Sequence, residues 1–264
     1  MNTNRSDLML KYLRAATDLL LPRRCIVCDR KLLLHEEHIC MHCVTDMPLT
    51  RFWAMDHNPM ADRFNSVIQN GLEKTWDEED TEQEFLLKAG GNEKYAYACA
   101  LFYYDSNGQY RHIPHQIKYM GNIPAGKFFG RMLGRRMAGE NLWRDVDCVI
   151  PVPLHWKRKW KRGYNQAEVI AVEIALTLGT EIRPGILRRK RNTVTQTKLD
   201  VKGKAENVRG AFEAADIGKS FRHILLVDDI FTTGATLHAC FLALRTRYDT
   251  STRISVATLG FVGY

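Results

Sequence analysis

Residues 224–236, ILLVDDIFTTGAT, place two adjacent aspartates directly after four apolar residues and follow them with threonines and a glycine. The apolar run predicts a buried strand, and the residues after it predict a turn that leads into a helix. Backbone N–H groups and hydroxyls in such a turn, together with the positive end of the helix dipole, are suited to bind a phosphate dianion. The two carboxylates, however, would repel a bare phosphate.

A ligand that carries a phosphate at one end and hydroxyls nearby resolves this conflict. Carboxylates accept hydrogen bonds from a ribose diol and help to hold a hydrated Mg²⁺ ion, so a ribose 5-phosphate is predicted. Gly234 is expected to let the backbone approach the anion closely. The alternative is a strand and an N-capped helix without function, in which Asp228 and Asp229 are merely exposed. The segment lacks Gly-Lys-Ser/Thr, so it is not a Walker A loop.

Four of the seven cysteines form two Cys-x-x-Cys pairs that are separated by eleven residues. This spacing lets four thiolates surround one tetrahedral zinc ion, and a closed four-sulfur shell leaves no position for substrate. We therefore predict a structural zinc knuckle with the ligands Cys25, Cys28, Cys40 and Cys43. The other cysteines lie in apolar settings and are predicted to be core residues: Cys99, Cys148 and Cys240.

The segment 224–236 resembles the phosphoribosyl-pyrophosphate (PRPP) motif of type I phosphoribosyltransferases at every position. The resemblance implies that Asp228 and Asp229 contact the ribose hydroxyls. It also implies that the following turn cradles the 5-phosphate through Thr232, Thr233, Gly234, Ala235 and Thr236. Residues 22–50 and 95–264 further resemble the ComF family, which is tied to competence and DNA uptake, through the knuckle, RGYNQ, and TQTKL followed by Asn and GAF. One departure is Lys204, where relatives often carry Arg and its bidentate fork. Lys118 and Tyr119 match the family's Lys-Tyr pair, to which the sequence assigns no chemical role.

The segment 154–166, LHWKRKWKRGYNQ, carries five cations with aromatic residues interleaved. In related transferases the loop at this place binds pyrophosphate, a leaving group that needs cations and N–H donors. The residues implied are Lys157, Arg158, Arg162, Gly163 and Asn165, with Arg162 counted as catalytic beside the two aspartates. Single-stranded DNA is an alternative ligand, because cations suit its backbone and aromatic rings stack on its bases. A solvated basic loop without function is the other alternative.

Residues 188–204 are polar and cationic, and long loops of this kind are usually functional or disordered. In related enzymes a mobile loop here closes over PRPP and excludes water. The candidates are Arg188, Thr195, Gln196, Lys204 and Asn207, with an ordinary surface loop as the alternative.

These residues must be positioned by the surrounding elements, and from residue 95 onward strands alternate with helices. The pattern predicts a type I phosphoribosyltransferase fold, a mostly parallel sheet with helices on both faces, in which ligands bind at the carboxyl ends of the strands. One helix, over residues 127–142, is expected to turn Phe128, Met132 and Leu133 to one side. Another begins after Asn165 as N-cap and ends at Gly179. The domains predicted are an amphipathic helix and zinc module (1–50), a solvated linker with an acidic segment at 73–84 (51–94), and the phosphoribosyltransferase-like domain (95–264).

The chain has 264 residues, a net charge of +8 and a pI near 9.1, which favours a polyanionic partner. It shows no secretory signal and no apolar stretch long enough to span a membrane, so a soluble cytoplasmic protein without membrane insertion is expected. The hypothesis is a ComF-like phosphoribosyltransferase, a pentosyl-transferring glycosyltransferase linked to DNA uptake. It would bind PRPP and Mg²⁺, transfer the phosphoribosyl group to a nitrogen acceptor and release pyrophosphate. The alternative is a PRPP-sensing or single-stranded-DNA-binding module without turnover. The sequence indicates neither the acceptor nor the oligomeric state.

Overall fold

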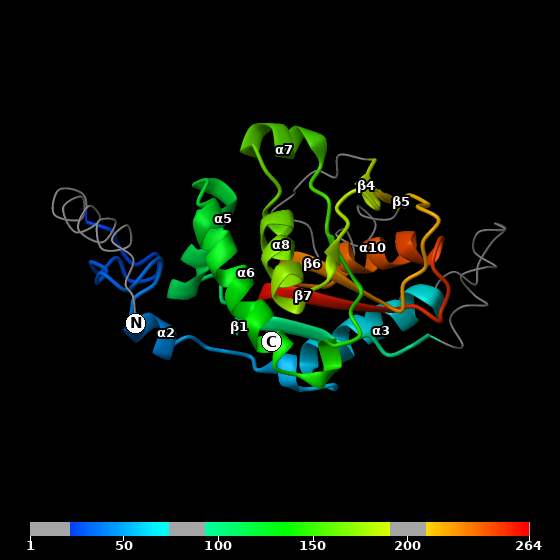
Figure 1. Ribbon diagram of the computed structural model, residues 1–264, viewed down its shortest axis with the longest axis horizontal. Coiled ribbons are helices and arrows are strands. Elements are labelled where there is room, and N and C mark those ends of the chain that lie inside the picture. Colours follow the sequence, from blue (N-terminus) through cyan, green and yellow to red (C-terminus); the bar gives the residue numbers. More distant parts are fainter. Residues whose placement is uncertain (1–21, 74–92, 191–209, 264) are drawn as a thin grey trace, which may run out of the picture.

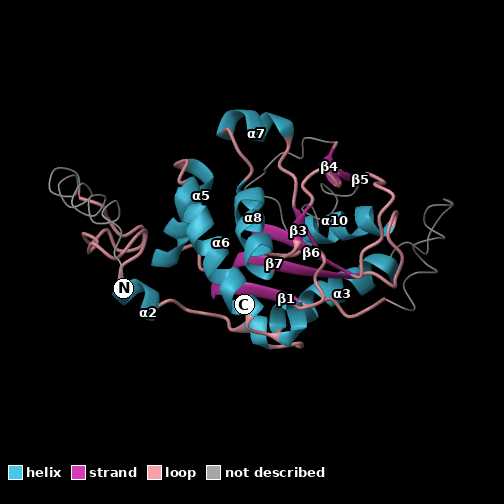
Figure 2. Cartoon of the chain, in the orientation of Figure 1, coloured by secondary structure: helices cyan, strands magenta, loops and turns pink. Residues whose placement is uncertain are grey.

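A computed structural model of the protein describes residues 22–73, 93–190 and 210–263, and its centre is a five-stranded parallel sheet. The strand order is β1-β7-β6-β2-β3, and every pairing is parallel. The strands are β1 (Ala98–Tyr103), β7 (Arg253–Phe261), β6 (His223–Phe231), β2 (Cys148–Pro151) and β3 (Glu181–Ile182). Figure 2 shows helices packed around this sheet, which confirms the predicted α/β architecture.

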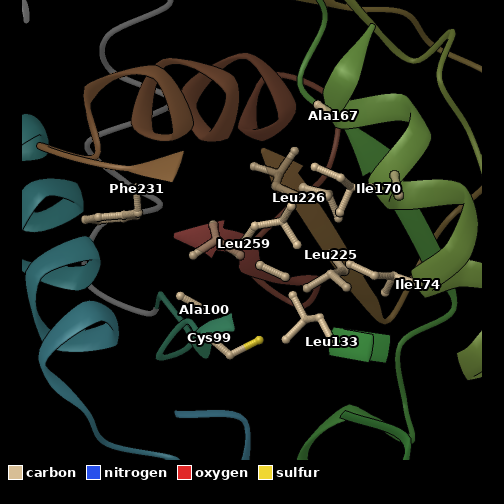
Figure 3. Close-up of a cluster of buried hydrophobic side chains, with 14 of the residues drawn as sticks. Cys99, Ala100, Leu133, Ala167, Ile170, Ile174, Leu225, Leu226, Phe231 and Leu259 are labelled. Carbon is tan, nitrogen blue, oxygen red and sulfur yellow. The ribbon is translucent and has the colours of Figure 1, made fainter. Parts of the chain in front are cut away.

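Helices lie on both faces of the sheet (Figure 1). Helices α6 (Ile123–Ala138) and α8 (Gln166–Leu178) pack on each other and on the central strands. Helices α3 (Pro59–Glu73) and α10 (Ala235–Arg245) lie on the opposite side (Figure 3). Because β6 is covered on both faces, residues 224–227 can all be apolar, and all four are buried.

The contact between α6 and α8 depends on glycines at positions 126, 130 and 134. A Cβ atom on Gly130 would lie 2.9 Å from the carbonyl oxygen of Ile170, so the two backbones approach more closely than any side chain would allow. With the three glycines facing α8, the side chains of Phe129, Leu133 and Met137 point into the core, where they are buried. Of the face predicted from sequence, Leu133 is buried, whereas Phe128 and Met132 are only partly buried.

Residues 52–73 correct the prediction of a solvated linker. Phe52–Ala54 form a 3-10 turn, η1, and α3 follows it. The ring of Phe64 on α3 packs edge-on against Phe231 and Phe241, with centroids 6.4 and 6.1 Å away. The apolar side of α3 thus covers the sheet. The acidic segment, from residue 74 onward, lies outside the described residues.

Shorter elements surround the carboxyl ends of the strands. Helix α5 (His112–Tyr119) and helix α7 (Trp156–Arg162) follow β1 and β2, and the hairpin of β4 (Leu187–Arg189) and β5 (Phe212–Ala214) follows β3. The zinc-knuckle segment contains one helix, α2 (Met41–Thr45), and the remaining 3-10 turns are η3 (Gln109–Arg111) and η4 (Asn141–Trp143). Within the described ranges, no helix has the length and apolar character needed to cross a membrane.

Candidate functional site

The acidic pair lies near the carboxyl end of β6, where the parallel sheet opens to its ligand-binding edge. Asp228 pairs in register with Thr258 of the neighbouring strand β7. Successive side chains of a strand point to opposite faces, so the two carboxylates leave the strand in different directions. Asp229 is buried and Asp228 is half-buried. The Asp229 N–H donates to Asp228 Oδ1 at 2.8 Å, which fixes the carboxylate of Asp228 against its own strand.

Lys118, the penultimate residue of α5, forms an ion pair with this site. Its Nζ lies 2.8 Å from Asp229 Oδ2, and the two side chains are 24% and 8% exposed. Burial lowers the pKa of Lys118, but the charges of Asp229 and Asp228 outweigh that effect and raise it above its usual value. Lys118 therefore carries its positive charge at neutral pH. Sequence reasoning noted the Lys-Tyr pair but found no role for it.

The charge of Asp229 acts on the neighbouring carboxyl group of Asp228. Burial, followed by the charge of Asp229, raises the pKa of Asp228 to about 7, although the nearby charges of Lys118 and Arg189 act in the opposite direction. Asp228 is thus poised between its neutral and ionised forms near neutral pH. Ionisable groups with such perturbed pKa values gather at functional sites, and this one lies where the fold class binds ligands.

The predicted phosphate turn consists of three residues, 232–234, and α10 begins at Ala235. Gly234 has a φ of +81°, and a Cβ atom there would lie 2.9 Å from Cζ of Phe231. Its conformation and its packing both require glycine, a reason that differs from the predicted approach to an anion. Thr233 Oγ1 accepts from the Ala235 N–H at 3.4 Å. Thr232 is exposed, and Thr233 and Thr236 are half-buried, so the turn is open to a ligand.

Arg63 on α3 forms hydrogen bonds with the backbone at this turn. Its Nη1 donates to the carbonyl oxygens of Thr232 at 3.3 Å and Val262 at 2.9 Å, and its guanidinium lies 4.9 Å from the centroid of the Phe261 ring. Sequence reasoning missed Arg63 because it lies in the predicted linker. The signal that could have found α3 is the apolar spacing of residues 60, 64 and 68.

The basic segment predicted as a loop is the short helix α7. Its N-cap, His155, accepts from the Lys157 N–H through Nδ1, and Gly163 ends the helix at a φ of +83°. Arg158 and Arg162 are half-buried on one side, whereas Lys157 is exposed. The helix has no buried residue, and the side chains of Trp156 and Trp160 are 65% and 87% exposed.

The two arginines of α7 interact with different parts of the structure. Arg162 donates to Gln166 Oε1, and its guanidinium lies 5.4 Å from the centroid of the Tyr119 ring on α5. The charge of Arg158 helps burial to lower the pKa of Arg189 on β4. Helix α7 lies between α5 and the β4–β5 hairpin (Figure 1).

Asn165 has a structural role in addition to the predicted one. Its Oδ1 accepts from the Ala167 N–H at 3.1 Å and caps α8, as predicted, while its Nδ2 donates to Val152 O at 3.0 Å. It thereby joins the end of β2 to the start of α8. Both ends of its amide are engaged by the backbone.

In the hairpin, Arg189 rather than Arg188 faces the site. Arg188 is exposed and lies opposite Glu213 of β5, whereas Arg189 is half-buried with its guanidinium 5.1 Å from the centroid of the Phe212 ring. The charge of Arg189 lowers the pKa of Asp228, so the guanidinium and this carboxyl group are close enough to interact electrostatically. The other predicted loop residues lie outside the described residues: Thr195, Gln196, Lys204 and Asn207.

The four predicted zinc ligands converge. The sulfur atoms of Cys25, Cys28, Cys40 and Cys43 all lie within 4.8 Å of one another. Those of Cys28 and Cys40 are 3.7 Å apart, close to the separation of about 3.8 Å that a tetrahedron with Zn–S bonds of about 2.3 Å requires. Cys25 Sγ also accepts from the Cys40 N–H at 3.4 Å, and the pKa of Cys25 is lowered to about 7, because hydrogen bonds from neighbouring backbone groups outweigh the effect of burial. The donor set fits a structural zinc ion.

Contacts outside the sulfur cluster hold the knuckle together and join it to the sheet domain. Glu36 accepts from the N–H groups of Leu33 and Met41, both at 2.7 Å, and so joins the loop between the cysteine pairs to the second pair. The hydroxyl of Tyr110 donates to Cys43 O at 2.9 Å. The three cysteines predicted as core residues are buried, as expected: Cys99, Cys148 and Cys240.

An Asp-His-Ser arrangement lies at the opposite, amino-terminal ends of the strands. His223 Nδ1 lies 2.7 Å from Asp145 Oδ1, and His223 Nε2 lies 2.7 Å from Ser255 Oγ. Ser255 is fully buried and also accepts from the Tyr97 N–H at 3.0 Å. A nucleophile must reach its substrate, so this array joins β6 and β7 to the segment before β1 instead of catalysing a reaction.

The fold is an α/β protein with a parallel sheet that carries an acidic pair near the carboxyl end of one strand, and sequence relatives indicate the family. The chain is 38% identical over 101 residues to Competence protein F of Haemophilus influenzae, covering 38% of this chain and 44% of that protein. It is 30% identical over 129 residues to DNA utilization protein YhgH of Escherichia coli K12, covering 47% and 55% respectively. It is 29% identical over 90 residues to Competence protein ComFC of Bacillus subtilis, covering 34% and 35%.

These relatives support a ComF-family protein, as the motifs predicted. The chain spans about half the length of the first two of them, 44% and 55%. No family model matches the chain.

Proposed function

We propose that the protein binds PRPP together with Mg²⁺. The observation that carries this proposal is the carboxylate pair at the end of β6, directly before a glycine-dependent turn and the start of α10. Asp228 and Asp229 would accept hydrogen bonds from the ribose hydroxyls, and the turn 232–236 would hold the 5-phosphate. Carboxylate oxygens are also the ligands that Mg²⁺ prefers, so the acidic pair suits an ion that enters with the phosphates of the ligand.

The proposed reaction transfers the phosphoribosyl group from PRPP to a nitrogen acceptor. The bond between the ribose carbon and pyrophosphate breaks, a carbon–nitrogen bond forms, and pyrophosphate leaves with the bonding electrons. Arg162 and Arg158 on the inner side of α7, with Lys157 beside them, would stabilise the negative charge of the leaving group. Mg²⁺ would supply further positive charge at the phosphates, while the two carboxylates orient the ribose.

The names of the relatives suggest the cellular process in which this activity would take place. Their names link them to competence and to DNA utilization, so a role in DNA uptake is proposed for this chain. The four-cysteine cluster is proposed to hold a zinc ion that stabilises the N-terminal module without taking part in the reaction.

One observation favours a second candidate function, binding of single-stranded DNA at α7. Trp156 and Trp160 are exposed beside Lys157, Lys159 and Lys161, and Lys157 Nζ lies 5.4 Å from the centroid of the Trp156 ring. Exposed rings among cations suit base stacking combined with backbone pairing. The two functions are compatible if DNA is the partner or the acceptor.

Calorimetric titration with PRPP tests the first proposal. The wild-type protein should bind PRPP only in the presence of Mg²⁺, and the Asp228→Asn/Asp229→Asn variant should lose that binding. Asp216→Asn removes an exposed carboxylate away from the site and serves as the control. Equal binding by the wild-type protein and the double variant would refute the assignment of the ligand to the acidic pair.

Fluorescence anisotropy with a labelled oligonucleotide tests the second candidate. Trp160→Ala leaves the charge unchanged and should weaken binding by roughly 1–3 kcal/mol if bases stack on the ring. Lys161→Gln should instead reduce the salt dependence of binding, because one counterion fewer is released. Binding that neither substitution changes would exclude α7 as the DNA surface.

A further inference from the structure

Lys118 is held in place more firmly than an ordinary surface lysine. Two neighbours of Lys118 on α5, Ile113 and Ile117, are fully buried in the core. The hydroxyl of Tyr164 donates to Ile117 O, and Arg162 lies over the ring of Tyr119. The residues on either side of Lys118 therefore contact the end of α7 and the segment that connects α7 to α8. These contacts hold the backbone of α5 in place and so position the ammonium group beside Asp229.

The contacts of the two carboxylates divide their oxygen atoms into two sets. Asp228 Oδ1 accepts from the Asp229 N–H, and Asp229 Oδ2 lies against the ammonium of Lys118. Asp228 Oδ2 and Asp229 Oδ1 make no hydrogen bond to any described part of the chain. Asp228 Oδ1 thus accepts a backbone hydrogen bond, Asp229 Oδ2 is ion-paired with Lys118 without accepting a hydrogen bond from the described residues, and the second oxygen of each carboxylate is left for a hydroxyl group of a ligand.

The same contact balances the charge of the site. Two carboxylates on adjacent residues at one strand end would attract a free cation and repel a phosphorylated sugar. A lysine ammonium beside Asp229 supplies the missing positive charge within the protein. An anionic ligand can then approach without a separate counter-ion for Asp229.

We propose that Lys118 is a positioning residue of this site, whose ammonium orients Asp229 and makes the acidic pair selective for an anionic phosphoribosyl ligand over a free divalent cation. The identity of the ligand rests on the proposed function. The charge-balancing role rests only on the contact between Lys118 and Asp229 and can be tested without PRPP.

The test substitutes Lys118→Met, which keeps most of the length of the side chain and removes its charge. Two probes are titrated in parallel: PRPP with saturating Mg²⁺, and Mn²⁺ alone. The variant should bind PRPP about thirtyfold more weakly or worse, the lower end of the cost of removing one partner of a buried ion pair. It should bind Mn²⁺ alone about tenfold more tightly, because the internal cation no longer competes for the carboxylate.

Two further variants control this experiment. Lys127→Met makes the same chemical change at an exposed position of α6 and should alter neither affinity. Lys118→Arg keeps the charge and should retain weak Mn²⁺ binding while losing part of the PRPP affinity, because the guanidinium is larger and planar.

The outcomes separate the two proposals. Opposite changes in the two affinities of Lys118→Met support the role of Lys118. A loss of both affinities would show that Lys118 only maintains the structure, and unchanged Mn²⁺ affinity would show that its charge does not balance the pair; either result overturns the inference. If wild-type protein binds no PRPP, the proposed function fails, and the Mn²⁺ titration alone still decides whether Lys118 is the internal counter-ion.

Discussion

Replacing Gly234 by alanine separates two reasons for a glycine in the phosphate turn. The φ of Gly234 is +81°, a left-handed conformation that costs an L residue about 1–2 kcal/mol. The added Cβ would also lie 2.9 Å from Cζ of Phe231, whose ring is buried and packs against Phe64 and Phe261. That ring cannot move aside freely, and such overpacking costs a further ~1–3 kcal/mol. Gly234→Ala should therefore lower the free energy of unfolding by roughly 2–5 kcal/mol.

Gly163 provides a matched control because its backbone has nearly the same conformation. Its φ and ψ are 83° and −15°, against 81° and −6° for Gly234, and a Cβ atom at Gly163 would meet nothing within 4 Å. Gly163→Ala should thus cost only the conformational part, about 1–2 kcal/mol. Urea denaturation of both variants at one pH measures the two costs, and their difference reports the contact with Phe231.

A double-mutant cycle with Phe231→Leu completes the assay, since the smaller side chain leaves room for the new methyl group. Gly234→Ala should cost less in that background than in the wild-type protein. Equal destabilisation by Gly234→Ala and Gly163→Ala, together with no coupling to Phe231, would refute the packing argument and leave the backbone conformation as the only structural reason for glycine.

Three other perturbations follow from the structure. Gly130→Ala on α6 should destabilise the protein by about 1–3 kcal/mol because its Cβ would meet the backbone at Ile170, whereas Gly139→Ala, with 3.5 Å to its nearest contact, should be nearly neutral in thermal denaturation. Removal of zinc by a chelator should expose four thiols per chain to a thiol reagent, and metal analysis that finds no zinc in the purified protein would contradict the knuckle. The hydrogen bond with His223 lowers the pKa of Asp145 below its ordinary 3.8. The resulting stability is complete above that ordinary value and is lost as the pH falls further, so the advantage of wild type over Asp145→Asn should shrink from about pH 5 to pH 2 in denaturation midpoints.

Elements whose pattern is local were predictable from the sequence. The uninterrupted apolar run of β6, the caps of α8 at Asn165 and Gly179, and the spacing of the four cysteines each carry their signal within a few neighbouring residues. Their packing partners follow from the fold class, because a strand that is apolar on both sides must be covered on both faces.

Other features depend on which side of an element faces the sheet, which local composition does not reveal. Helix α3 was predicted as linker because its apolar residues 60, 64 and 68 are separated by polar ones, yet this spacing of four is that of a helix packed on one side. The segment of α7 was predicted as a loop because related transferases have a loop at this place, and the helix that it forms buries no residue. Arg188 was chosen over Arg189 without knowledge of the strand register, and in a strand one step of register reverses the face.

The charge balance of the site depends on tertiary structure alone. The two aspartates are adjacent in sequence, but the cations that act on them come from α5 and β4, before and after the second strand of the chain. They meet because the carboxyl ends of parallel strands converge at one edge, and the elements that follow those strands must pass over it. Lys118 and Arg189 thus place positive charge beside the two carboxylates that precede the turn 232–234. Because the segment 224–236 itself contains no cation, the sequence offered only ligand hydroxyls and Mg²⁺ as partners for the two carboxylates.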